Sequence, residues 1–308
     1  MTLFTRQNIG QSQRHQGVSV RKALITAAGG LALALALSAC GGVGDGKYQD
    51  ADSLVRAATA STEKVKSTAF TLTMKVGPLG MTGEGASSYD SSDPRTQMTM
   101  SIDVGALGGG AEPMEMEARQ IGEDLYLKLP TNLPGGMVDE NKPWHKTSVA
   151  EQVPGSTLDV DRYLQSTDPS KMIEMLKESG ELVDTETGVS VNNRSATKYS
   201  FEVDFQKVLE NYGGNLESMP GMSQFDLDAI PVDIYLDEQD LPARLYIDFR
   251  EVVEQAIEQA GGEGNLPDGV SFDEAYMQMD FTDWGNEVQV EAPPADEISD
   301  QPIPGMGG

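Results

Sequence analysis

The chain has very few of the residues that form covalent cross-links, metal sites and strong nucleophiles. Its 308 residues include one cysteine, Cys40, and two histidines, His15 and His145. A single cysteine excludes an intramolecular disulfide, so an ordinary apolar core has to stabilise the folded part. A zinc site takes three or four cysteine and histidine ligands, and His145 is the only such side chain beyond Cys40. We therefore expect no metal and no cofactor.

Positive charge is scarce as well. Only 22 lysines and arginines stand against 49 aspartates and glutamates, which gives a formal net charge of −27. Nucleic acids and anionic lipid surfaces carry charge of the same sign, and such a field repels them. Nucleic acid is therefore excluded as a partner. Beyond residue 39, long apolar runs are also missing, so no later segment is predicted to span a bilayer.

The position of the cysteine is the most informative feature that is present. A 15-residue apolar stretch, 23–37, follows a segment with four basic residues and no acidic one, and Ser38 and Ala39 then precede Cys40. This order is typical of a secretory signal that ends in a lipobox. An uncleaved membrane helix is disfavoured because about 20 apolar residues are needed to span a bilayer. A buried free thiol is the other alternative.

Four segments are predicted on this basis. Residues 1–39 form a lipoprotein signal peptide, 40–50 a glycine-rich tether, 51–292 the folded domain, and 293–308 a disordered tail rich in Pro, Gly and Asp. Cys40 is the predicted lipid attachment site, which places the protein on the extracytoplasmic face of the cell membrane. Loss of the signal changes the net charge from −27 to −31. Length alone leaves one large or two small β domains open.

Apolar and polar residues alternate with a period of two in many segments, which predicts strands with one apolar face. Strands buried on both faces would show continuous apolar runs, so these strands indicate an antiparallel sheet. Helices are predicted at 52–66, at 168–180 and at 252–260, with a short turn at 208–209. The expected fold class is α+β, with one sheet and a few helices on one side. The alternating segments are 70–76, 98–104, 125–129, 199–205, 232–236, 245–249, 277–281 and 288–290.

No catalytic set is recognisable. His145 lies beside Trp144 without a Gly-x-Ser-x-Gly turn, which favours a strand or turn residue over a general base. The acidic pairs at 159–161 and 226–228 match no calcium loop and are typical of solvated surface. We expect no enzyme, and a hydrolase among the carboxylates is the least favoured alternative.

Methionine is frequent, with 15 residues, and it gathers at the apolar positions of the predicted strands. Its flexible, polarisable side chain suits surfaces that accept varied apolar ligands, but it also fills gaps in ordinary cores. Both interpretations stay open from the residues alone. The candidate cavity residues are Phe70, Leu72, Met74, Met98, Met100, Met114, Met116, Phe201, Met277 and Met279.

Several short segments in order, over about residues 50–295, resemble actinobacterial lipoproteins of the LppX/LprA/LprF/LprG type. The segments are the lipobox at Cys40, 67–71, 122–128, 143–146, 168–169, 193–199, 203–204, 232–237, 241–242 and 290–294. The resemblance implies a LolA-like half-barrel, that is, a curved antiparallel sheet with helices closing its concave face. It also implies an apolar pocket for the acyl chains of lipids or lipoglycans, and palmitate among the groups carried by the anchor.

The resulting hypothesis is a membrane-anchored, non-catalytic lipoprotein of the cell envelope that binds or transports lipid. We expect the helix around Met172, Ile173, Met175 and Leu176 to act as a lid. The chain is longer, richer in Gly and Pro loops and more acidic than the smaller members of the family. An envelope adaptor or sensor subunit, which binds another protein through its acidic surface, is the alternative.

Overall fold

The computed structural model describes residues 46–90, 92–103, 105, 112–131, 138–148, 169–204, 206–208, 229–259, 261–262 and 271–301. The predicted signal peptide and Cys40 lie outside these residues. So do Asp168, Phe205, Leu209 and the acidic pairs at 159–161 and 226–228.

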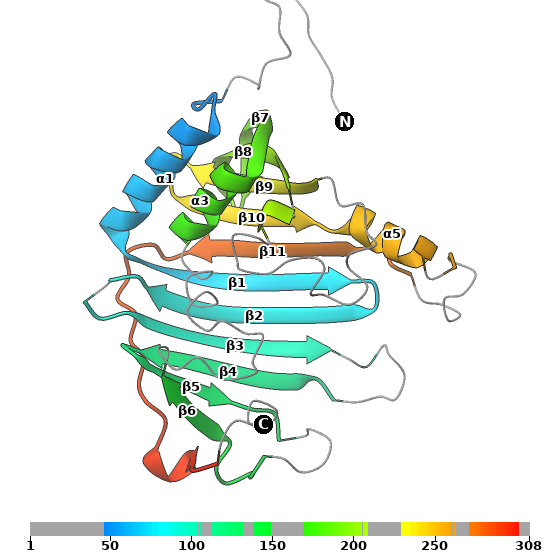
Figure 1. Ribbon diagram of the computed structural model, residues 1–308. Helices are drawn as coiled ribbons and strands as arrows, with labels where there is room; N and C mark the ends of the chain where they lie inside the picture. The colour runs from blue at the N-terminus through cyan, green and yellow to red at the C-terminus, as the bar shows by residue number, and fades with distance from the viewer. Residues whose placement is uncertain are drawn as a thin grey trace, which may run out of the picture. The chain divides into compact units, whose positions relative to one another are not determined.

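Within the described residues, twelve strands form one sheet, in the order β12-β6-β5-β4-β3-β2-β1-β11-β10-β9-β8-β7 (Figure 1). Every neighbouring pair is antiparallel except β12 and β6. The predicted α+β class with a mostly antiparallel sheet is confirmed. The strands are β1 (Ser67–Val76), β2 (Leu79–Ser88), β3 (Arg95–Asp103), β4 (Met114–Ile121), β5 (Asp124–Lys128), β6 (Trp144–Ser148), β7 (Gly180–Val191), β8 (Arg194–Val203), β9 (Ile230–Asp237), β10 (Pro242–Asp248), β11 (Ala275–Thr282) and β12 (Ile298–Ser299).

The sheet consists of two meanders. Strands β1 to β6 follow one another in chain order, as do β7 to β11, and β1 pairs with β11 along most of its length. Short turns join β1 to β2, β4 to β5, β7 to β8 and β9 to β10. The β9–β10 turn contains the Asp-rich segment 237–240, with Asp240 at φ 63°. Long-range pairing of β1 with β11 therefore unites the two halves.

Three helices accompany the sheet: α1 (Ala51–Val65), α3 (Pro169–Ser179) and α5 (Arg250–Gln259). Asp50 caps α1, because its carboxylate accepts a hydrogen bond from the backbone N–H of Ser53 at 2.8 Å. Lys66, in the left-handed conformation, ends the helix. The predicted helix at 168–180 is α3, which starts at Pro169. The third predicted helix is α5.

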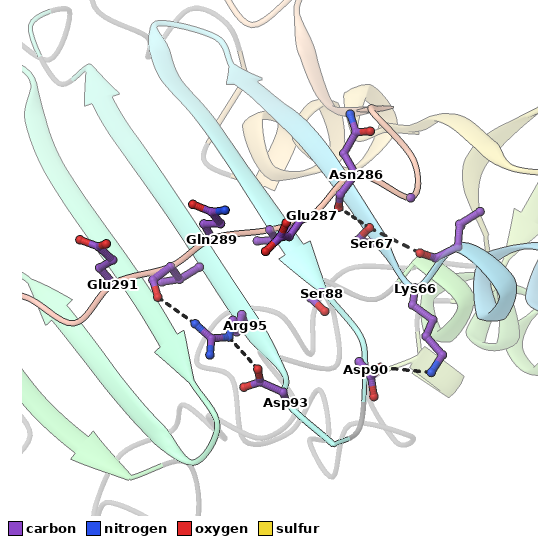
Figure 2. A pocket seen from close by; sticks show the side chains of 14 residues that line it. Lys66, Ser67, Ser88, Asp90, Asp93, Arg95, Asn286, Glu287, Gln289 and Glu291 are labelled. Carbon is purple, nitrogen blue, oxygen red and sulfur yellow. Dashed lines mark hydrogen bonds and ion pairs between the residues drawn. The ribbon is translucent and has the colours of Figure 1, made fainter.

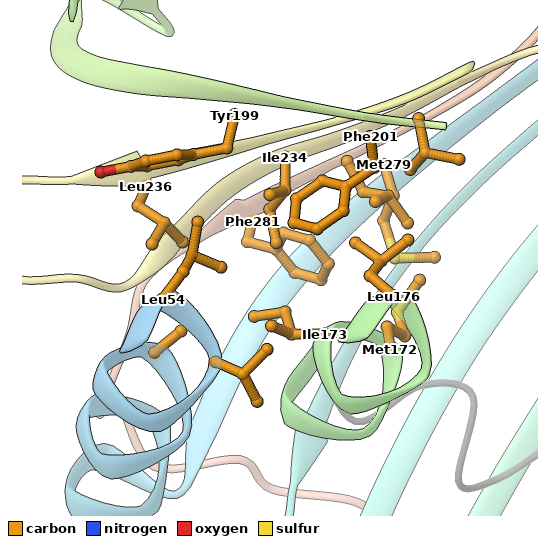
Figure 3. Packing of buried hydrophobic residues seen from close by; sticks show 14 of the residues in the cluster. Leu54, Met172, Ile173, Leu176, Tyr199, Phe201, Ile234, Leu236, Met279 and Phe281 are labelled. Carbon is orange, nitrogen blue, oxygen red and sulfur yellow. The ribbon is translucent and has the colours of Figure 1, made fainter. Parts of the chain in front are cut away.

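Helices α1 and α3 pack together on one face of the sheet, over β8 to β11 (Figure 1). Figure 3 shows Leu54 of α1 and Ile173 and Leu176 of α3 pointing toward Phe201 and Phe281 of the sheet. All five side chains are buried. Each side chain of this size stabilises the fold by about 1.5 to 3 kcal/mol through removal of apolar surface from water. The core is therefore concentrated at one end of the sheet.

The sequence interpretation predicted no strand at β2, β4, β6 or β7. Glycines at 83 and 85 interrupt the apolar face of β2, and Thr and Glu fill β7. Neither strand shows the alternation of large apolar and polar residues that predicts a strand. The predicted strand at 288–290 is wrong, because those residues join no ladder. At 206–208 the predicted helical turn is present.

Two predicted segment boundaries also need correction. The tail was expected to be disordered from residue 293, but 295–297 form a short 3-10 helix, η5 (Ala295–Glu297), and β12 pairs with β6. Backbone hydrogen bonds between β12 and β6 order this segment, which composition alone does not reveal. The last five residues of the predicted tether, 46–50, contact the domain: Lys47 binds Asp240 at 2.6 Å, and the Tyr48 ring lies 6.1 Å from that of Tyr199.

We expect Gly85→Ala to lower the free energy of unfolding by about 2 kcal/mol, because a new Cβ has to displace packed atoms. That Cβ would lie 2.5 Å from the carbonyl oxygen of Gln97 and 2.6 Å from Cζ of Phe70. Gly80→Ala on the same strand is the matched control, since its Cβ would meet only Asp103 Cβ, at 3.9 Å. The control should be neutral or stabilising by about 0.5 kcal/mol. Urea unfolding measures both, and equal midpoints would contradict this packing.

Candidate functional site: the apolar sheet face

The strand register places the predicted cavity residues on one face of the sheet. We call this the apolar sheet face; it carries Phe70, Leu72, Met74 and Val76 of β1 together with their register partners. The opposite, polar sheet face carries Thr71, Thr73 and Lys75 and their partners. Because side chains alternate along a strand, each register pair keeps both residues on the same face.

Two cross-strand rows of this face are rich in methionine, and we call them the methionine rows. In each row a residue of β11 pairs with one of β1, which pairs in turn with β2, β3 and β4. The first row is Met279, Leu72, Gly83, Met100 and Met116, and the second is Met277, Met74, Met81, Ile102 and Met114.

Burial separates the candidate residues into two groups. Phe70, Met98, Phe201 and Met279 are buried at 2, 5, 1 and 8 % exposure and belong to the core beneath the helices. The remaining members of the methionine rows are half-buried. Leu72, Met100 and Met277 pack against the edge of the core, and Met74, Met81, Met114 and Met116 lie beyond it. Core packing thus explains the apolar side chains of the first group. The second group provides apolar surface that the core does not fully cover.

On this face, the glycines of β2 make room for side chains of the neighbouring strands β1 and β3. At Gly85 the space above the backbone is occupied by the Phe70 ring. At Gly83 the Met100 side chain comes within 3.4 Å of the position that a Cβ would take. A methionine can change rotamer at modest cost, so this part of the face can adjust its shape.

The predicted lid helix is packed into the core. Met172, Ile173 and Leu176 are buried, and Met175 is half-buried. All three buried residues belong to the same cluster as Leu54 and Phe201. The lid role stays a prediction; the contacts assign α3 a packing role at the core end of the face.

Several polar side chains lie at one end of this face, and they form hydrogen bonds with groups nearby. Thr68 donates to the Thr282 carbonyl at 2.8 Å, and the hydroxyls of Ser87 and Thr96 lie 2.6 Å apart. Gln120 donates to the Gly122 carbonyl. His145, on β6, is also on this face and is 3 % exposed. It is a strand residue, as predicted.

A second feature lies on the polar sheet face. The C-terminal strap, residues 283–301, crosses the ends of β1 to β4 and then adds β12 beside β6 (Figure 2). Ser67 donates to the Asn286 carbonyl at 2.7 Å, and Arg95 donates to that of Val290 at 3.2 Å. A cavity of about 580 Å³ lies between strap and strands. Its lining is polar, so it does not suit an acyl chain.

Within this cavity both cations are paired with carboxylates. Lys66 lies 3.2 Å from Asp90, and Arg95 lies 3.0 Å from Asp93. Hydrogen bonds from Ser92, and then the Lys66 ammonium, lower the pKa of Asp90 to about 2. Over the described residues, His, Cys, Asp and Glu side chains form no group of three that could hold a metal ion.

Met81 is the member of the methionine rows that the sequence interpretation missed. A weak signal was present, because Leu79 and Met81 are apolar and have the same parity, but Gly83 and Gly85 follow them on that face. Among the described helices, none combines the length and apolar character required for a membrane span. No protein-family model matches this sequence, and no curated protein is similar to it.

Ser92→Ala is expected to raise the pKa of Asp90 from about 2 toward its ordinary value of 3.8. Lys66→Met should raise it as well, because this change removes both the hydrogen bond and the positive charge of the ammonium group. A lowered pKa in the folded state means that the interaction stabilises the fold above about pH 4 and is lost as the pH falls toward 2. Carboxyl NMR titration measures this pKa, and an unchanged pKa in Ser92→Ala would contradict the assignment.

Proposed function

We propose that this protein is a membrane-anchored lipoprotein of the cell envelope that binds or transfers acyl lipids on its apolar sheet face, without catalysis. The sheet corresponds in this proposal to a LolA-like half-barrel, and Cys40 carries the lipid anchor. The half-buried methionine rows are the single observation that supports the proposal most. They provide apolar surface that core packing does not use.

The position of these rows suits an acyl chain. One side of the rows meets the core under α1 and α3, so a chain lying along Leu72 and Met100 would continue an existing apolar surface. The other side runs to β4, at Met114 and Met116. Covering about 100 Å² of such surface stabilises a complex by about 2.5 kcal/mol before the entropy of binding is subtracted.

The contacts of the N-terminal segment support an anchored arrangement. Lys47 forms its ion pair with Asp240 of the β9–β10 turn, and Tyr48 packs near Tyr199 of β8. The Asp240 carboxylate raises the pKa of Lys47, so this pair persists across the physiological range. Six residue steps from Cys40 to Gly46 reach at most about 20 Å. A lipidated Cys40 would therefore hold this end of the sheet close to the bilayer.

Native mass spectrometry of the chain from Gly42 tests the proposal. Residues 42–308 form one compact unit that contains all the described helices and strands. Purified from an actinobacterial host, this form should carry about one acyl lipid per chain, and solvent extraction should identify it. A mass without lipid, unchanged after incubation with envelope lipids, would instead favour the protein-binding adaptor.

Met100→Glu should reduce bound lipid at least tenfold, because a carboxylate on the methionine rows has to lose its hydration when an acyl chain covers it. Gln97→Glu is the matched control. Gln97 lies on the same strand and adds the same charge, but it is exposed on the polar sheet face opposite Arg119. The readout is lipid per chain by native mass spectrometry, with circular dichroism to confirm folding. Equal lipid content in the two variants would contradict a site on this face.

A further inference from the structure

His145 has a buried ring nitrogen without a partner. Its Nδ1 lies 3.2 Å from the backbone carbonyl oxygen of Gln301, at the end of the C-terminal strap. Its Nε2, the ring nitrogen farther from the backbone, is buried and has no hydrogen-bond partner among the residues that the structure describes. A buried polar atom in this state costs about 1 to 3 kcal/mol, so its presence on an apolar surface requires a reason.

The Gln301 contact determines which nitrogen carries the proton. A carbonyl oxygen only accepts hydrogen bonds, so Nδ1 has to donate. In the neutral imidazole, Nε2 then has a free lone pair and acts as an acceptor. A hydroxyl or N–H group satisfies it, whereas an ester or a carboxylate oxygen does not.

The location connects this acceptor with the methionine rows. His145 pairs with Leu127 of β5, which continues through Ala118 and Met98 to Phe70 of β1. This row is adjacent to the first methionine row on the same apolar sheet face. The neighbouring polar groups Ser87, Thr96 and Gln120 already have partners, whereas His145 Nε2 does not.

We propose that His145 Nε2 accepts a hydrogen bond from a hydroxyl group of the bound lipid and thereby selects hydroxyl-bearing lipids. This inference rests on the proposed lipid-binding function. The hydroxyl belongs either to a polyol head group or to a hydroxylated acyl chain, and the two sources share the same chemistry at the histidine.

Three lipid probes separate these possibilities. Methyl oleate has no hydroxyl, methyl ricinoleate adds one on the acyl chain, and monoolein places hydroxyls on its glycerol head. The chain from Gly42 should bind at least one of the hydroxyl-bearing probes about five- to tenfold more tightly than methyl oleate, the worth of one net hydrogen bond. Whichever probe shows the preference identifies the source of the hydroxyl.

Two substitutions at this position provide matched variants. In His145→Asn the amide can still donate to the Gln301 carbonyl, but nothing occupies the place of Nε2, so the preference should disappear while methyl oleate affinity stays unchanged. In His145→Gln a polar group returns near the Nε2 position, and part of the preference should return. A loss of affinity for all three probes in the Asn variant would indicate a structural role and overturn the proposal.

A spectroscopic measurement on the unmodified sequence needs no variant. His145 is the only histidine after residue 39, so histidine-selective ¹⁵N labelling of the chain from Gly42 gives one imidazole. Its Nε2 resonance should have the position of an unprotonated nitrogen and should move upfield with the hydroxyl-bearing probe alone. Binding of all probes with no change at Nε2 would overturn the inference and leave the proposed function standing. No binding of any probe would overturn the proposed function itself.

Discussion

The pairing of β1 with β11 is the interaction on which the rest of the structure depends. It joins residues about 200 positions apart and turns two separate meanders into one sheet. Phe70 thereby lies opposite Phe281, Leu72 opposite Met279, and Met74 opposite Met277. A one-residue slip would move all of these side chains to the other face, so apolar burial fixes the register. The core and the methionine rows both follow from this pairing.

Because side chains alternate along each strand, the two faces of the sheet make different contacts. Helices α1 and α3 cover the apolar face only over β8 to β11, where the core is complete. The C-terminal strap crosses the polar face, where Arg95 and Arg119 donate to its carbonyls at Val290 and Glu291. The strap therefore secures the edge at β6 through polar contacts and does not occupy the methionine rows. The methionine rows and the C-terminal strap therefore lie on opposite faces of the sheet.

Much of the fold could be predicted from the sequence because its signals are local. The period-two pattern identified β1, β3, β5, β8, β9, β10 and β11. The spacing of apolar residues identified α1, and the Asp168-Pro169 start identified α3. The remainder depends on distant partners. Strand β2 is glycine-rich because the Phe70 ring needs the space above Gly85, and β12 exists because β6 offers an edge. Likewise, the ten candidate residues share one face of the sheet because of strand pairing, and their division into buried and half-buried residues depends on the packing of α1 and α3.

The sequence by itself determined the class of the fold, the parity of the apolar residues, the scarcity of chemically reactive side chains and the acidic character of the surface. All of these depend on neighbours a few residues apart or on composition. Only the tertiary structure decided which methionines remain half-buried and that His145 Nε2 is left without a partner. The physical reason is that burial and hydrogen-bond satisfaction are properties of contacts between distant segments, which the pairing of β1 with β11 and of β6 with β12 brings together.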